Sequence, residues 1–242
     1  MRMSAERYAR IREMLALRQP DLTVCLEEVH KPHNVAAVVR SCDAVGVHQI
    51  HGVWNEANTT RKGTSMGSQV WVKNKRHDTI GDAVAHLKYT GMQVLVTNLS
   101  QTAVDFREVD YTKPTAIILG QEKSGATAEA IELADTDIII PMVGMVQSLN
   151  VSVAGALVLY EAQRQRENAG LYKHTRLAES ECQRVLFEGG FPQLHKICER
   201  KKLPYPYINE SGEIEAEDHW WQKVQLSKDA FELQLEETQN NQ

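Results

Sequence analysis

Hydrophobic residues in the middle of the chain form short, uninterrupted apolar runs. Three of these runs, at 94–96, 116–119 and 138–140, contain no alternating polar positions. A strand of this kind is buried on both faces, which is typical of a parallel sheet covered by helices. The pattern predicts an α/β fold with a mostly parallel sheet flanked by helices. We expect its strands at 22–26, 49–54, 70–72, 93–99, 115–119 and 137–141.

Between the apolar runs, hydrophobic residues recur at helical spacing. In the clearest case, which starts at Asn34, the residues Val35, Val38 and Cys42 fall on one face. Asn34 is a residue type that caps helix N-termini, and Gly46 is one that ends helices. We expect helices over 34–45 and, on similar grounds, over 6–18, 79–91, 127–134, 150–166, 179–188 and 191–202.

Two regions depart from this pattern. Residues 55–68 are polar and lack apolar periodicity, which predicts a long loop of the kind that is often functional. Residues 209–242 contain nine acidic residues and two lysines. We therefore divide the chain into a basic N-terminal helix, an α/β domain and a C-terminal helical extension with an acidic tail, at 1–20, 21–168 and 169–242.

The composition is that of an ordinary globular protein. Hydrophobic residues make up 42% of the 242 residues, and no apolar run reaches the length of about 18 residues that a membrane span needs. The first residues are charged and lead into no apolar segment, so we expect no secretory signal and a cytoplasmic protein. The four cysteines form no C-x-x-C pair, and we expect reduced thiols in the core, with neither a metal site nor disulfides.

The net charge of −5 argues at first against RNA binding, because phosphate contacts need clustered Lys and Arg. Residues 209–242 alone carry −7, however, so the preceding residues carry about +2. Basic residues gather near the N-terminus, around 164–176 and at 200–202. Taken singly, such clusters are more often solvated helix faces than RNA sites. The candidate RNA contacts are Arg7, Arg10, Arg18, Arg164, Arg166 and Lys201.

The glycine-rich fingerprint of dinucleotide-binding folds is missing, since the turn after the first strand, at 28–34, contains no glycine. Instead, three polar clusters follow strands of the expected sheet: Asn34 with Arg40, residues 119–125, and residues 140–150. The carboxyl ends of parallel strands meet at one edge of a sheet, and ligands bind there. The three clusters therefore predict one common site.

These clusters resemble the three sequence motifs of the SPOUT superfamily, in its SpoU/TrmH branch of RNA ribose 2′-O-methyltransferases. Segments outside the motifs, at 186–191, 203–206 and 212–216, and the arginine-rich N-terminal helix resemble the subgroup that methylates guanosine 18 of tRNA. The first motif is matched by Asn34 and Arg40, the second by Gly120, Glu122 and Gly125, and the third by Pro141, Ser148, Leu149, Asn150, Val151 and Ala154.

One departure from the motifs concerns Ala36, where many relatives have glycine. Alanine suits a helix better than glycine does, so we expect little consequence.

The resemblance implies a deep trefoil knot in the C-terminal part of the sheet, a rare exception to unknotted topology. It also implies S-adenosylmethionine as the methyl donor, bound mainly by backbone groups among the knot loops, and the 2′-hydroxyl of tRNA guanosine 18 as the acceptor. The matched donor-binding positions are Thr97, Gly120, Ile140 and Leu149, and the matched catalytic positions are Arg40, Asn34, Glu122, Ser148 and Asn150.

Relatives of this kind build their active sites at a homodimer interface formed by the motif-one helix and the last helix of the domain. Val153, Leu157 and Tyr160 could supply the apolar seam of such an interface, and a stripe facing the core is equally compatible with their spacing. Two other functions stay open: methylation of another tRNA or rRNA nucleotide, and a non-catalytic RNA-binding module.

Two roles of Arg40 are compatible with the sequence. By resemblance it accepts the proton of the 2′-hydroxyl, but a guanidinium has a pKa above about 12 and is a poor base near neutral pH. It could instead clamp a phosphate with two parallel hydrogen bonds and stabilise the developing alkoxide. Both roles predict a loss of activity when Arg40 is replaced.

Overall fold

The computed structural model describes residues 1–54 and 71–225. The polar loop expected at 55–68 and most of the acidic tail therefore lie outside the described residues. The chain forms two compact units, one of Ala16–Arg176 and one of Met1–Leu15 together with Leu177–Gln242. These boundaries are set by backbone contacts, and the functional division at 1–20, 21–168 and 169–242 stays a prediction.

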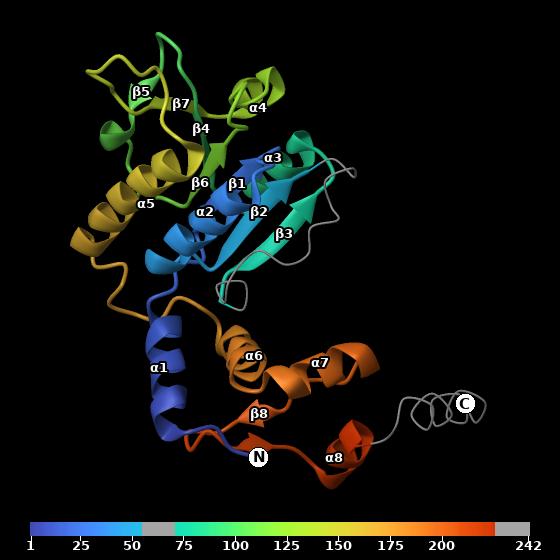
Figure 1. The fold of residues 1–242 in the computed structure, drawn as a ribbon. Helices are drawn as coiled ribbons and strands as arrows, with labels where there is room; N and C mark the ends of the chain where they lie inside the picture. The colour runs from blue at the N-terminus through green and yellow to red at the C-terminus, as the bar shows by residue number, and fades with distance from the viewer. Residues whose placement is uncertain (55–70, 226–242) are drawn as a thin grey trace. The chain divides into compact units, whose positions relative to one another are not determined.

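The larger unit is built on a seven-stranded sheet with the spatial order β3-β2-β1-β6-β4-β7-β5 (Figure 1). Every neighbouring pair of strands runs parallel, which confirms the α/β class predicted from the apolar runs. The strands are β1 (Leu22–Glu27), β2 (Gln49–Val53), β3 (Lys73–His77), β4 (Gln93–Thr97), β5 (Val104–Asp105), β6 (Thr115–Leu119) and β7 (Thr136–Ile139).

Helices cover both faces of this sheet because successive residues of its strands point to opposite sides. Val24 of β1 packs into a core beneath α2 (Pro32–Ala44) and α5 (Val151–Asn168), which lie against each other (Figure 1). Cys25, the next residue, packs into a second core beneath α3 (Ile80–Tyr89) and α4 (Ala128–Leu133). A short 3-10 helix, η3 (Phe106–Glu108), follows β5. All four cysteines are buried, as expected of thiols in the core.

Two elements of the larger unit begin two or more residues from the predicted position, and the short strand β5 was not predicted. The edge strand β3 is Lys73–His77. Of the expected strand at 70–72, residue 70 lies outside the described residues and residues 71–72 are not in a strand. The middle residues of β3 are polar and exposed, so they carry no apolar pattern. Helix α2 begins at Pro32, with Lys31 as its N-cap, and not after Asn34. Proline suits the first helical position because its ring fixes φ and the missing N–H would be unpaired there. Asn34 consequently lies within the first turn.

The smaller unit packs around aromatic side chains. Phe187 lies 4.6 Å from Tyr205 and 6.3 Å from Trp220, measured between ring centroids. The N-terminal segment is held in this unit by a backbone hydrogen bond of 2.9 Å, which the N–H of Met3 donates to the carbonyl of Gly212. Its elements are α1 (Ala5–Ala16), α6 (Glu179–Gly190), α7 (Pro192–Lys201), β8 (Tyr207–Ile208), β9 (Ile214–Glu215) and α8 (Asp218–Gln225), of which β8, β9 and α8 were not predicted.

Across residues 1–54 and 71–225, no helix has the length and apolar character needed to cross a membrane.

Candidate active site

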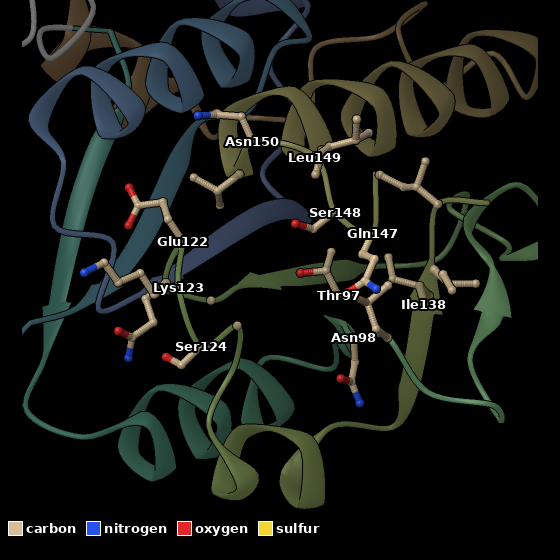
Figure 2. A pocket seen from close by; sticks show the side chains of 18 of the residues that line it. Thr97, Asn98, Glu122, Lys123, Ser124, Ile138, Gln147, Ser148, Leu149 and Asn150 are labelled. Atoms are coloured by element: carbon tan, nitrogen blue, oxygen red, sulfur yellow. The ribbon is translucent and has the colours of Figure 1, made fainter. Parts of the chain in front are cut away.

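A cavity of about 550 Å³ opens at the carboxyl ends of β6, β4 and β7, which are neighbours in the sheet (Figure 2). Its walls come from residues 97–99 after β4, 120–125 after β6, and the end of β7 with the segment that leads into α5. The second and third polar clusters of the sequence therefore meet in one cavity, as predicted from the strand ends.

The turn after β6 depends on a glycine. A Cβ atom at Gly120 would stand 2.2 Å from the backbone nitrogen of Ala126 and from the carbonyl carbon of Gly125. Gln121 and Gly125 also exchange backbone hydrogen bonds of 3.1 and 3.0 Å. The turn from 120 to 125 is thus closed tightly, and it holds Glu122 and Lys123 at the cavity wall.

A chain of hydrogen bonds links all three motifs. The amide Nδ2 of Asn34 donates to Oε1 of Glu122 at 2.6 Å. The amide Nδ2 of Asn150 donates to Oδ1 of Asn34 at 3.2 Å. Asn150 also caps α5, since its Oδ1 accepts from the backbone N–H of Ser152 at 2.9 Å. Asn34, Glu122 and Asn150 therefore form one connected network beside the cavity.

The negative charge of Glu122 fixes the orientation of the Asn34 side-chain amide in this network. Partial burial by itself would raise the pKa of Glu122, but the hydrogen bond from Asn34 and the positive charges of Lys31 and His30 outweigh it and lower the pKa. A carboxylate can only accept hydrogen bonds. It therefore holds the NH₂ group of Asn34 toward itself and turns the amide oxygen of Asn34 toward Asn150.

The four residues predicted to bind the methyl donor, Thr97, Gly120, Ile140 and Leu149, all line the cavity. Ser148 lines it as well, from the segment before α5. Figure 2 shows Thr97 and Ser148 in the middle of the cavity between its two sides. The structure therefore brings the proposed donor-binding positions together with Glu122, Ser148 and Asn150.

Sequence reasoning missed other residues of this cavity. Lys31 and Lys123 line it near Glu122. Asn98 lines it too and donates a hydrogen bond of 2.8 Å to the carboxylate of Asp137. The sequence offered one indication of Lys123 and Asn98, which is their position next to predicted site residues: Lys123 directly follows Glu122, and Asn98 directly follows Thr97.

Arg40 is absent from the described cavity lining and is exposed on α2. It lies six residues after Asn34, which at about 100° per residue carries it roughly 240° further round the helix. Asn34 faces the interior, so Arg40 must project from a different face. Within one subunit, the structure does not bring Arg40 to the Asn34–Glu122–Asn150 network.

Three of the residues predicted to contact RNA have internal roles instead. Arg166 is 0% exposed and donates to Asp21 and to the carbonyls of Tyr111 and Lys113. Arg18 is buried against Asp43 at 2.5 Å. Lys201 is buried and donates to the carbonyls of Lys223 and Val224, at 2.6 and 2.9 Å. Buried side chains with these partners cannot reach a bound RNA, which corrects the prediction for Arg18, Arg166 and Lys201.

The other three candidates lie on the surface. Arg10 is exposed, Arg7 is exposed and donates to the carbonyl of Gly189 at 2.7 Å, and Arg164 is exposed and pairs with Glu161 at 2.7 Å. Contact between these arginines and RNA stays a prediction. In the described parts of the chain, no three His, Cys, Asp or Glu side chains are grouped so that they could hold a metal ion.

The apolar stripe of α5 faces outward. Val153, Leu157 and Tyr160 are 47%, 42% and 52% exposed. Their spacing of four and three residues puts them on one side of the helix. A stripe facing the core is therefore wrong, and the role of these residues as the seam of a homodimer stays a prediction.

Comparison with known proteins assigns this fold and site to a family. The model of the SpoU rRNA Methylase family matches residues 21–160, and that of its C-terminal region, SpoU, rRNA methylase, C-terminal, matches residues 164–217. The tRNA (guanosine(18)-2′-O)-methyltransferase of Escherichia coli (strain K12) is 63% identical over 228 residues, which are 93% of this chain and 100% of that protein.

Solved structures agree with this assignment. The crystal structure of the A. aeolicus TrmH/SpoU tRNA modifying enzyme is 43% identical, with a TM-score of 0.72, over 77% of this chain and 96% of that one. The SpoU methyltransferase AviRb from Streptomyces viridochromogenes, in complex with the cofactor AdoMet, is 28% identical, with a TM-score of 0.53, over 62% of each chain. This chain belongs to the SpoU rRNA methylase family, in agreement with the resemblance of its three motifs.

Proposed function

We propose that this chain transfers a methyl group from S-adenosylmethionine to the ribose 2′-hydroxyl of guanosine 18 in tRNA. The observation that carries the proposal is the cavity at the ends of β6, β4 and β7, into which the second and third motifs converge beside Asn34 of the first. The choice of guanosine 18 is supported by the 63% identity, across the full length, with the E. coli enzyme of that name.

The cavity fits S-adenosylmethionine in size and chemistry. Its volume of about 550 Å³ lies within the range of roughly 300 to 1,000 Å³ typical of ligand pockets. Gly120 lets the turn after β6 close against the backbone of Gly125 and Ala126, which shapes one wall. Ile140 and Leu149 add apolar surface. When bound, the donor supplies a methyl group on a positively charged sulfur, which makes that methyl group electrophilic.

The residues of this chain contribute mainly by positioning. Alignment of reacting groups can supply a large part of the rate enhancement of such a transfer. The network of Glu122, Asn34 and Asn150 ties the turn after β6 to the first turns of α2 and α5, and so fixes the walls that would hold both substrates. Arg40 either accepts the hydroxyl proton or clamps a phosphate, and these two roles stay open.

Homodimerisation belongs to the proposal. The exposed apolar surface of Val153, Leu157 and Tyr160 on α5 suits a second copy of the chain. Helix α2 packs against α5, so Arg40 would lie close to such an interface and would meet active-site residues there. The exposed position of Arg40, outside its own cavity, supports this arrangement.

Two further points are part of the same proposal. The segment 140–150 would be threaded through the trefoil knot expected of this fold, because it links β7 at the cavity with α5. The protein would act in the cytoplasm on tRNA.

The test is to map the methylated nucleotide. Purified protein is incubated with labelled donor and an unmodified tRNA transcript, and the product is digested and sequenced. We expect 2′-O-methylation at guanosine 18, and none in a transcript that carries 2′-deoxyguanosine at that position. Methylation elsewhere would favour another RNA target. A protein that binds tRNA without binding the donor would be a non-catalytic module.

A further inference from the structure

Two lysines that the mechanism above does not use stand at one side of the active-site cavity. Lys31 is the N-cap of α2, and Lys123 follows Glu122 in the turn after β6. We propose that Lys31 and Lys123 together bind a backbone phosphate of the RNA next to the ribose that is methylated. This inference rests on the proposed function, because it requires an RNA substrate.

The backbone holds both lysines in place. Pro32 fixes the chain directly after Lys31 at the start of α2. The mutual hydrogen bonds of Gln121 and Gly125 close the turn that carries Lys123. Both lysines therefore extend from anchored backbone positions near Glu122, the residue that joins the two motifs through Asn34.

This side of the cavity carries an excess of positive charge, which would attract an anion. Across residues 1–54 and 71–225, neither Lys31 nor Lys123 forms a hydrogen bond or ion pair through its side chain, and both are exposed. Glu122 is the one acidic residue among those that line the cavity, and its carboxylate already accepts from Asn34. Two lysines against one occupied carboxylate leave positive charge that faces the cavity.

An RNA phosphate fits this charge better than the methyl donor does. The sulfur of the donor is positive, so lysines beside it would repel it. Figure 2 shows Glu122 and Lys123 on one side of the cavity, Thr97, a proposed donor position, in its middle, and Ile138 and Gln147 on the other side. Every ribose 2′-hydroxyl within an RNA chain lies on the carbon next to one that carries a phosphate. A substrate that presents its hydroxyl here must therefore bring a phosphate close by.

The experiment measures RNA binding without the donor. The full-length protein and the variants Lys31→Gln, Lys123→Gln and the double variant are titrated with unmodified tRNA transcript over a range of salt concentrations. Because the two lysines share one phosphate, the double variant should reduce the slope of log affinity against log salt by about 0.7. Each single variant should reduce the slope by a part of that amount. Lys31→Arg and Lys123→Arg should keep the slope of the original protein.

Lys113→Ala is the matched control, because Lys113 is an exposed lysine just before the amino end of β6, at the opposite edge of the sheet from the cavity. It should leave both the slope and the methylation rate unchanged. Calorimetry with S-adenosylmethionine should give the same affinity for the double variant as for the original protein, which also shows that the cavity is intact.

Two results would overturn the proposal. The first is a salt slope of the double variant equal to that of the original protein. The second is a loss of donor binding by the double variant, combined with equal affinity of both proteins for a donor analogue that lacks the carboxylate. The second result would assign the lysines to the carboxylate of the donor. If the original protein methylates no tRNA at all, the proposed function fails instead, and the two failures are thereby distinguished.

Discussion

Gly120 is the residue on which the shape of the cavity depends most directly. Its missing side chain lets the backbone at Gly125 and Ala126 close over it, at distances of 2.2 Å from a hypothetical Cβ. Because the obstructing atoms belong to the backbone, they cannot give way as the end of a flexible side chain would. The turn that carries Glu122 would have to move as a whole.

We predict that Gly120→Ala destabilises the protein by about 1–3 kcal/mol, the usual cost of overpacking. It should also weaken donor binding about tenfold, or by roughly 1.4 kcal/mol, because the turn forms one wall of the cavity. Urea unfolding and calorimetry with the donor measure the two effects. Gly144→Ala is the control, since a Cβ there would meet no atom within 4 Å. Equal behaviour of the two variants would contradict the argument.

The site could be predicted from sequence where the information was local. Thr97 ends the buried strand β4 and Gly120 directly follows the buried strand β6, and the carboxyl ends of parallel strands meet at one edge of the sheet. The role of Arg166 could not be predicted in this way, because its partner Asp21 lies 145 residues earlier. A basic residue indicates an RNA contact only if its side chain reaches solvent, and that depends on the fold.

At the level of elements, helices and strands with a repeated apolar pattern could be predicted, while short elements with a single buried residue, such as α8 with Trp220, were missed. The apolar runs located β4 and β6 because these strands are covered on both faces, and they located β7, in which Ile138 is buried and its neighbours are half-buried. The edge strand β3 has exposed polar residues in its middle and therefore carried no such signal. The short strands β8 and β9 pair with each other, and two residues are too few for a pattern.

The packing of β2, β3 and α3 produces a cluster of three histidines, one from each element. The ring of His51 lies 5.1 Å from that of His77 and 5.5 Å from that of His86, and its Nδ1 is 2.8 Å from Nε2 of His77. Burial, and then the charges of His77, His86 and Lys75, lower the pKa of His51 to about 3. His51 therefore stays neutral in the folded protein when it would be protonated in the unfolded chain.

We predict that this cluster makes the fold less stable in mild acid. A histidine with a lowered pKa contributes its full stability above its unfolded pKa of about 6.5 and loses it as the pH falls toward the folded value. At pH 5 the loss from His51 should be about 2 kcal/mol. Urea unfolding measures the free energy of unfolding at pH 7 and at pH 5. The difference between these two free energies should be smaller for His51→Gln than for the original protein. His174→Gln, at an exposed histidine, should keep the full difference; a similar reduction in both variants would rule out the cluster.

At the scale of the whole molecule, charge and exposed apolar surface point to different partners. Residues 209–242 carry a charge of −7, which exceeds the net charge of −5 of the whole chain. The remaining residues therefore carry about +2, a charge that is compatible with RNA binding. An apolar surface on α5, by contrast, suits a protein partner, and closed symmetric dimers are the commonest assembly of soluble proteins. Neither inference was available from the total composition, because both depend on where the residues lie.

We predict that Leu157→Glu gives a monomer. Leu157 stands between Val153 and Tyr160 on the exposed surface of α5, and a carboxylate buried there in a dimer would lose its hydration without gaining a partner. Sedimentation should give twice the chain mass for the original protein and the single mass for the variant, with methylation lost if Arg40 acts at the interface. Circular dichroism checks that the variant is folded.

Tyr89→Glu, at a tyrosine that is 91% exposed on α3, should stay dimeric and active. A Leu157→Glu protein with the original mass would show that this surface of α5 does not join two subunits.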